Sequence, residues 1–175
     1  MRAVMALLFS ACVPAGSPTL LIDGRDPALV QQHGALHYAG RPFTGTLIDD
    51  SDGRYVQHVP YRLGLRHGNA RAYYADGTLA YDRTFAFGLR EGVHSGFWPG
   101  GQVQFVYRYA HDVFDGEQVA YYKNGVRSEL RHFQGGREEG RQQIWDGQAR
   151  LTTNYIVKEG RRYGIVGRSD CVAVH

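Results

Sequence analysis

The sequence predicts an all-β fold, an elongated antiparallel β-meander of hairpin repeats about 24 residues long. An aromatic residue followed by two glycines returns at this spacing. An Asp-Gly or Asn-Gly dipeptide follows within several of the units, and the chain is rich in glycine (23) and tyrosine (12). Self-similarity at a fixed period of this length is typical of stacked repeats. The leading aromatics of the four clearest units are Tyr61, Phe85, Tyr109 and Phe133.

Each unit is predicted to be one β-hairpin. In the unit that begins at Tyr61, residues 68–74 have the length of a strand, residues 75–77 form a turn, and residues 78–85 form a second strand. Asp-Gly and Asn-Gly supply the positive backbone angles of a tight hairpin turn. We therefore expect positive φ angles at the turn glycines, which are Gly77, Gly101 and Gly125.

Alternation along the second strands predicts which side chains share a face of the sheet. Phe105, Tyr107 and Tyr109 lie two residues apart and are expected on one face. The column of Ala72, Gly96 and Ala120 stays small, which leaves room for a neighbouring ring. Stacked hairpins of this kind bury a continuous apolar face that a single hairpin cannot.

The period weakens at both ends of the array. A degenerate unit begins 23 residues before Tyr61, with its turn at Asp52-Gly53, and the turn at Trp145-Asp-Gly147 is two residues shorter than its predecessor. Atypical end repeats are expected because they cap sheet edges. The array is predicted to hold about five and a half units, or roughly eleven strands, and residues 26–32 at most one helical turn.

The N-terminus resembles a short bacterial lipoprotein signal peptide. Arg2 precedes an apolar run over residues 3–9, and Ser10-Ala11-Cys12 follows it. The run is too short to span a bilayer. We expect cleavage before Cys12 and its lipidation. An ordinary cleaved signal, or a cytosolic protein with an apolar start, remain the alternatives.

The chain therefore divides into four predicted parts. These are a signal peptide (1–11), a tether (12–25), a domain of hairpin repeats (26–167) and a C-terminal tail (168–175). If Cys12 is acylated, Cys171 is an unpaired thiol. If the protein is exported without acylation, the two cysteines could pair only if both chain ends met, which an elongated stack disfavours.

Successive units share one motif. Gly64-Leu-Arg-His-Gly68 is followed by the aromatic pair Tyr73-Tyr74 and by Asp76-Gly77, and the pattern returns from Gly88 to Gly101. With this motif the units resemble the MORN-variant repeats of bacterial YwqK-type proteins. The resemblance covers residues 34–164, with Asp112 in place of one turn glycine. The resemblance implies a repeat protein without a catalytic residue set. Members are often labelled antitoxin components, which implies a partner toxin, and a lipoprotein signal argues against a cytosolic one.

Several kinds of chemistry are disfavoured by the sequence. The net charge of +3 is spread along the chain, so we expect no nucleic-acid partner. The eight histidines are interpreted as scattered surface residues, and no metal or cofactor is expected. Asp49, Asp50 and Asp52 lack the spacing of a calcium loop and fall at a turn, where Asp is favoured. The glycine-rich turns lead into strands, whereas phosphate loops lead into helices.

An aromatic ladder is the one predicted binding surface. Alternation predicts that one ring of each adjacent pair packs inward and the other faces solvent. Such rings could hold a glycan or a partner peptide, although many ladders only pack a sheet. The ladder comprises Tyr73, Tyr74, Phe97, Trp98, Tyr121, Tyr122 and Trp145.

Three functions are carried forward from the sequence. The first is a noncatalytic scaffold at the periplasmic face of the bacterial envelope, held to the membrane by a lipid anchor, that binds a protein partner. The second is a glycan or cell-wall binder that uses the ladder. The third is a cytoplasmic antitoxin that masks a toxin. An enzyme is not expected, because no nucleophile, base and orienting group converge on one repeat.

Overall fold

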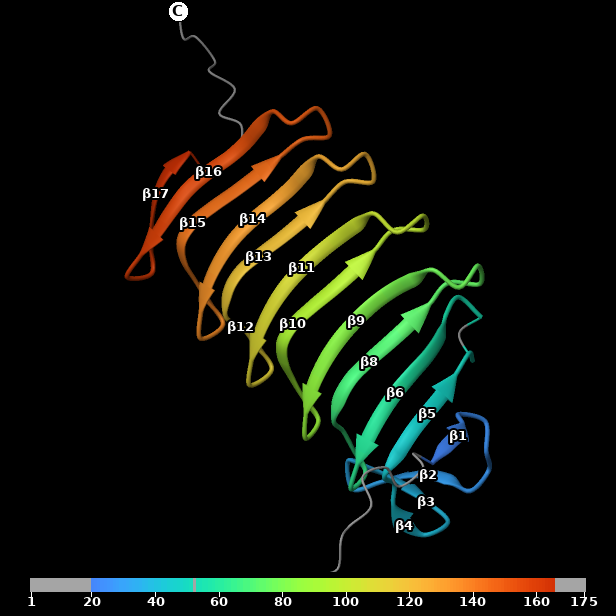
Figure 1. Ribbon diagram of the computed structural model, residues 1–175. Helices are drawn as coiled ribbons and strands as arrows, with labels where there is room; N and C mark the ends of the chain where they lie inside the picture. The colour runs from blue at the N-terminus through green and yellow to red at the C-terminus, as the bar shows by residue number, and fades with distance from the viewer. Residues whose placement is uncertain (1–19, 52, 166–175) are drawn as a thin grey trace, which may run out of the picture.

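The computed structural model describes residues 20–51 and 53–165, and it forms β-strands with no helix in that part of the chain. The predicted meander of hairpins is confirmed (Figure 1). The long strands are β5 (Gly45–Asp49), β6 (Val56–Arg62), β8 (Gly68–Tyr73), β9 (Leu79–Ala86), β10 (Leu89–Phe97), β11 (Val103–Ala110), β13 (Gly116–Tyr121), β14 (Arg127–Gln134), β15 (Arg137–Trp145), β16 (Leu151–Lys158) and β17 (Arg161–Ile165). The short strands are β1 (Leu21–Asp23), β2 (Leu29–Gln32), β3 (Ala35–Tyr38), β4 (Arg41–Pro42), β7 (Leu65–Arg66) and β12 (Val113–Phe114).

One long, single-layered sheet makes up most of the molecule. It has 14 strands among the described residues, and from β5 to β17 each long strand pairs antiparallel with the long strands before and after it in the sequence. Figure 1 shows the hairpins stacked side by side as one twisted layer, with no second layer over β8 to β16 among the described residues. Both faces of the central sheet are therefore left without a covering element in that part of the chain.

The two faces of the sheet differ in burial. We name one the packed face, and its members in the central sheet are buried or half-buried, with the exception of Arg66, which is exposed. Cross-strand pairs fix its membership, for example His94 opposite Arg83 and Tyr107, and Gly96 opposite Phe105. The opposite, open face carries exposed polar residues such as Asn69 and Arg108. The packed face comprises Gln57, Val59, Tyr61, Arg66, Ala70, Ala72, Tyr81, Arg83, Phe85, Arg90, His94, Gly96, Phe105, Tyr107, Tyr109, Phe114, Gln118, Ala120, Glu129, Arg131, Phe133, Glu138, Gln142, Ile144, Thr153, Tyr155 and Val157.

The small column on the packed face has the predicted purpose at Gly96. A Cβ atom added there would lie 2.1 Å from Cε1 of Phe105. The Phe105 ring therefore lies directly over the Gly96 backbone, and the absence of a side chain is a packing requirement. The φ angle of Gly96 is not in the left-handed region, so sterics alone select glycine here.

The hairpin tips confirm the predicted positive φ angles, which are +82° at Gly77, +85° at Gly101 and +81° at Gly125. In the first of these turns Tyr74 N–H donates to the Thr78 carbonyl and Gly77 N–H to the Tyr74 carbonyl. This is a three-residue loop in which a G1 bulge supplies the left-handed residue. The Asp-Gly dipeptide was expected to supply positive φ angles, but Asp76 does not adopt one. Its Oδ1 instead accepts the Thr78 N–H at 2.9 Å.

The expected shortening of the fifth unit is wrong. Ala149, 24 residues after Gly125, has a φ angle of +63° and donates its N–H to the Asp146 carbonyl. The loop therefore keeps its length, but alanine takes the position of glycine. Asp146 stands where the other tips have their second aromatic, and its Oδ1 accepts the N–H groups of Gln148 and Arg150. The prediction of a shorter loop is wrong because Gly147 is not the residue with the left-handed conformation.

The opposite ends of the hairpins carry two-residue turns that join neighbouring repeats. Phe87 and Gly88 have φ angles of +47° and +91°, as a type I′ turn requires. The Gly88 N–H then donates to the Arg66 carbonyl of the preceding unit at 2.8 Å. Asp112 fills the glycine position at +71° and bonds the Arg90 carbonyl in the same way. The array is thus held together by backbone bonds between successive turns.

The N-terminal end is closed by a different arrangement. Strand β1 pairs parallel with β5, and β2, β3 and β4 form a separate three-stranded sheet. Ile22, Leu36 and Phe43 form a buried cluster there. Residues 21–23 therefore belong to the folded part rather than to the expected tether. Residues 29–32 form a strand instead of a helical turn, and the described part of the chain has seventeen strands where roughly eleven were expected.

The predicted signal peptide, Cys12, Cys171 and the tail at 168–175 lie outside the described residues. Within residues 20–51 and 53–165, no helix is long and apolar enough to cross a bilayer.

Candidate functional site

The predicted aromatic ladder lies along the hairpin tips, but its rings are not divided between inside and outside. Both rings of every pair are half-buried, except that Tyr122 is 37% exposed. The expectation of one inward and one outward ring is therefore wrong. The first ring of each pair ends a strand and the second begins the turn, where the regular alternation of a strand no longer holds.

The second ring of each pair hydrogen-bonds to the next repeat. Tyr74 Oη donates to the Phe97 carbonyl at 2.7 Å, and Tyr122 Oη to the Trp145 carbonyl at 3.0 Å. Between them Trp98 Nε1 donates to the Tyr121 carbonyl at 3.3 Å. Each bond spans 23 residues and joins one tip to its neighbour. These rings therefore set the spacing of the tips. The sequence allowed a packing role for the ladder but did not predict these hydrogen bonds between repeats.

One hollow lies beside the ladder. Tyr55 packs 5.4 Å from Tyr74, and these rings line a hollow of about 340 Å³ with Trp98. Burial raises the pKa of the Tyr74 phenol. The remaining lining includes Arg54 and Lys123, so the hollow combines aromatic surfaces with basic groups.

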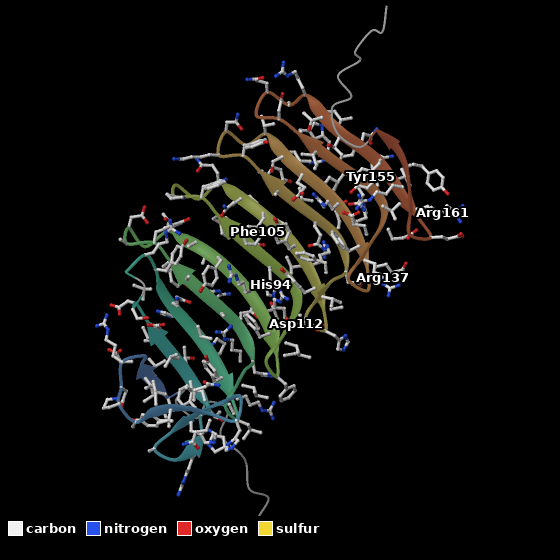
Figure 2. The ribbon with its side chains drawn as sticks, turned by 180° about the vertical axis from the view of Figure 1, so that it is seen from behind. His94, Phe105, Asp112, Arg137, Tyr155 and Arg161 are labelled. Carbon is white, nitrogen blue, oxygen red and sulfur yellow. The ribbon has the colours of Figure 1, made fainter. Side chains whose placement is uncertain are left out.

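A second line of rings crosses the packed face. Phe85 lies 5.5 Å from the His94 ring, and His94 lies 4.6 Å from Tyr109. Phe114 continues the line, 4.8 Å from Tyr109 and 5.2 Å from Phe133. We name these five residues the aromatic row. Figure 2 shows His94 and Phe105 in the middle hairpins. Phe85, Tyr109 and Phe133 are leading aromatics of the sequence repeat, but the repeat pattern alone does not predict that they form a surface together with His94 and Phe114.

Buried polar side chains complete the packed face. His94, Gln118 and Gln142 recur at 24-residue spacing and are 3%, 3% and 1% exposed. Gln118 Oε1 accepts the Arg108 N–H and its Nε2 donates to the Arg108 carbonyl. His94 Nε2 bonds the Thr84 carbonyl at 2.8 Å, and Gln142 Nε2 donates to the His132 carbonyl at 2.8 Å.

These side chains fill gaps in the backbone ladder. The β9–β10 register shifts between Arg90 and His94, which leaves the Thr84 backbone without a strand partner there. In the first unit the equivalent pair is Pro60 and Ala70. Proline has no N–H group to satisfy, and its carbonyl accepts the backbone N–H of His67 at 2.9 Å, so a small apolar residue suffices at position 70. The surface interpretation of the histidines is thus wrong for His94, because an alternating pattern cannot reveal a bulge. Burial lowers the pKa of His94.

The packed face is neutralised at its C-terminal end. Glu138 accepts hydrogen bonds from Arg131 Nη1 at 3.0 Å, Arg162 Nη2 at 2.9 Å and Tyr155 Oη at 3.1 Å. Glu129 accepts a further bond from Arg131 Nε. Burial raises the pKa of Tyr155, and the hydrogen bond to Glu138 adds to this. Figure 2 shows Tyr155 in this end of the sheet.

The N-terminal end of the packed face carries guanidinium groups instead. The Arg83 guanidinium lies 4.0 Å from the Tyr81 ring centroid, and Arg66 lies 5.5 Å from that of Phe85. No ion pair joins either arginine to a carboxylate among the described residues. Between them is a hollow of about 120 Å³ that Gln57 and Val59 also line.

The carboxylates at the first tip do not converge on a cation site. Asp50 is paired with Arg25, and Asp49 Oδ1 accepts the Ser51 N–H at 2.9 Å. Hydrogen bonds to Ser51 hold the pKa of Asp49 below its usual value. In the part of the chain that the structure describes, no group of three or more His, Cys, Asp or Glu residues could hold a metal ion. Asp52 lies outside that part.

Compared with known proteins, the chain matches no protein-family model. No curated protein matches it either.

Proposed function

We propose that this chain is a noncatalytic interaction scaffold of the bacterial envelope that binds a protein partner on its packed face. The observation that carries the proposal is the combination of a single-layered sheet with the aromatic row and the adjoining guanidinium groups. Aromatic residues and arginine are enriched in protein interfaces and dominate their binding energy. The resemblance of the units to MORN-variant repeats supports an interaction role over catalysis.

The packed face is favoured over the ladder for a physical reason. The second rings of the ladder are engaged in bonds between repeats, so a ligand there would compete with the sheet's own contacts. The rings of the aromatic row contact one another instead, at 4.6–5.5 Å. Tyr109, Phe114 and Phe133 are half-buried, so part of each ring is available to a partner, whereas Phe85 and His94 are buried beneath the face.

Two adjacent residues of β11 allow a direct test of the face. Tyr107 belongs to the packed face and Arg108 to the open face. A photo-crosslinking amino acid placed at position 107 of the full chain, in its native cell, should give a discrete adduct with one protein. The same amino acid at position 108 should not. Adducts from position 108 alone would refute the proposed face.

The envelope location is tested separately. Replacement of Cys12 with Ser should abolish incorporation of labelled palmitate and release the protein from the membrane fraction. Cys171→Ser is the matched control and should fractionate like the wild type. A wild-type protein found unlabelled in the cytosol would contradict the anchor and favour the antitoxin hypothesis.

A glycan binder is the second candidate, and the hollow beside Tyr55, Tyr74 and Trp98 favours it. Aromatic rings can stack on sugar rings, and Lys123, which also lines the hollow, could bond hydroxyl or carboxylate groups. A glycan array that includes peptidoglycan fragments would test it. Binding that is lost in Lys123→Gln but retained in Arg83→Gln would place the ligand at this hollow. A blank array would remove the candidate.

A further inference from the structure

One column position of the packed face changes the sign of its charge between the two ends, and another keeps it. Glu138 follows Arg90 by 48 residues, whereas Arg131 follows Arg83 by the same distance. At the C-terminal end the Glu138 carboxylate lies between Arg131 and Arg162, with the Tyr155 phenol as a third donor. At the N-terminal end Arg66 and Arg83 flank a hollow beside the Tyr81 ring.

We infer that the hollow between Arg66 and Arg83 receives an Asp or Glu side chain from an acidic segment of the protein partner. The C-terminal network shows what this arrangement holds when the carboxylate is supplied by the chain itself. Guanidinium groups bind carboxylates with two parallel hydrogen bonds, which adds directional specificity to the charge. The inference deepens the proposed function, since it assumes that the packed face is the surface that the partner covers.

The size of the hollow selects a side chain rather than a whole small molecule. Its volume is about 120 Å³. Pockets for cofactors and drug-sized ligands measure roughly 300–1,000 Å³. A carboxylate on a short stem fits the smaller space, and the rest of the ligand would lie over the aromatic row.

The charge balance around the hollow supports an anionic occupant. The packed-face residues of β6 to β10 contain no carboxylate. The nearby Asp82 is on the open face, where it pairs with Arg71 at 3.0 Å. Arg90 is bound to Asp112 at 2.6 Å, so it is already neutralised. Arg66 and Arg83 are therefore the positive groups that a partner would meet.

The test uses the full chain and three labelled heptapeptides. They share the sequence Gly-Tyr-X-X-X-Tyr-Gly, where X is Glu, Gln or phosphoserine, and binding is measured by fluorescence anisotropy at low ionic strength. The Glu peptide should bind, and the Gln peptide should bind at least about tenfold more weakly, because only the charge differs. The variant with Arg66→Gln and Arg83→Gln should bind the Glu peptide at least about tenfold more weakly than the wild type.

A matched double variant controls for net charge. Arg108→Gln with Arg141→Gln removes two exposed charges from the open face and should change binding by less than about threefold. Melting curves of both doubles verify that they fold. Equal losses in the two doubles, or equal binding of the Glu and Gln peptides, would overturn the inference. Tighter binding of the phosphoserine peptide through the same arginines would also overturn it, in favour of a phosphate site.

Failure here is distinguishable from failure of the proposed function. If position 107 forms its adduct but the Glu peptide shows no preference, the carboxylate site is refuted and the scaffold stands. If the peptide result holds but position 107 forms no adduct, the carboxylate site exists and the proposed partner surface is wrong. Analytical sedimentation of the wild-type chain, which measures its oligomeric state, adds a third test. A dimer that Arg66→Gln and Arg83→Gln dissociates would show that a second copy supplies the carboxylate.

Discussion

The hairpins β8–β11 and β13–β16 have the same backbone plan but fill the packed face by different chemistry. In the first region rings and arginines occupy the face, and Phe105 lies over Gly96. In the second region Glu129, Arg131 and Glu138 form an ion-paired network. Arg83 contacts the Tyr81 ring, whereas Arg131, 48 residues later, pairs with the Glu129 carboxylate. The repeat fixes the backbone, and the side chains above it are free to vary because each strand bonds only to its neighbours.

The largest expected effect concerns the ring-and-glycine region. Gly96→Ala should destabilise the protein by about 1–3 kcal/mol, because its Cβ has no space beneath the Phe105 ring. Chemical denaturation measures this change. A double variant of Gly96→Ala with Phe105→Leu should recover part of the loss. Ala120→Gly, at the equivalent position one repeat later, should cost less than about 1 kcal/mol. No change in Gly96→Ala would mean that the ring moves aside freely.

The next effect concerns the ion-paired region. Glu138→Gln should cost about 1–2 kcal/mol, because Arg131 and Arg162 lose a largely buried common partner whose side chain is 18% exposed. Exposure of the Arg162 side chain reduces the cost through solvent screening. Arg66→Gln in the first region should change stability by less than about 0.5 kcal/mol. Equal costs for the two variants, measured by denaturation, would contradict the contrast between the regions.

A third test compares the buried polar residues His94 and Gln142. Burial lowers the pKa of His94, and Arg83 and Arg90 lower it further. The neutral form is therefore favoured in the folded state. Its contribution to stability is fully present above the unfolded pKa of about 6.5 and is lost as pH falls from there through the lower folded pKa.

His94→Gln gives position 94 the same residue type as the equivalent position 142, and it removes this titration. Melting temperatures of the wild type and the variant should converge in their pH dependence above neutrality and diverge in the acid range, where the wild type falls more steeply. The other histidines are common to both proteins and cancel in the comparison. Parallel curves for the two proteins would show that His94 does not control acid stability.

The smallest expected effect lies at the hairpin tips. Ala149 adopts a φ angle of +63° where Gly125 adopts +81°. Ala149→Gly should stabilise the protein by about 0.5–1 kcal/mol, and Gly125→Ala should destabilise it by a similar amount, because an L side chain is strained in this region. Thermal melts of the two variants should therefore shift in opposite directions. Shifts of the same sign would mean that unfolded-state entropy dominates at both turns.

Much of the fold could be predicted because the 24-residue spacing of the repeat is visible in the sequence. Gly77, Gly101 and Gly125 were assigned correctly, since turn geometry depends on local backbone sterics. The fifth tip was misplaced because Gly147 has the residue type but not the conformation of the left-handed position. The inward and outward division of Tyr73 and Tyr74 also failed, because strict alternation ends where the turn begins. Of the candidate site, the sequence located the ladder but not the aromatic row as a surface.

The sequence by itself determined the all-β class, the 24-residue hairpin repeat and the glycine-dependent turns, because these depend on local conformation and periodicity. Only the tertiary structure decided the parallel pairing of β1 with β5, the burial of His94 beside a register shift, and the contrast between Arg83 and Arg131. Each of these depends on which distant backbone or charge lies beside a residue. That arrangement is set by strand register, and one bulge is enough to change it.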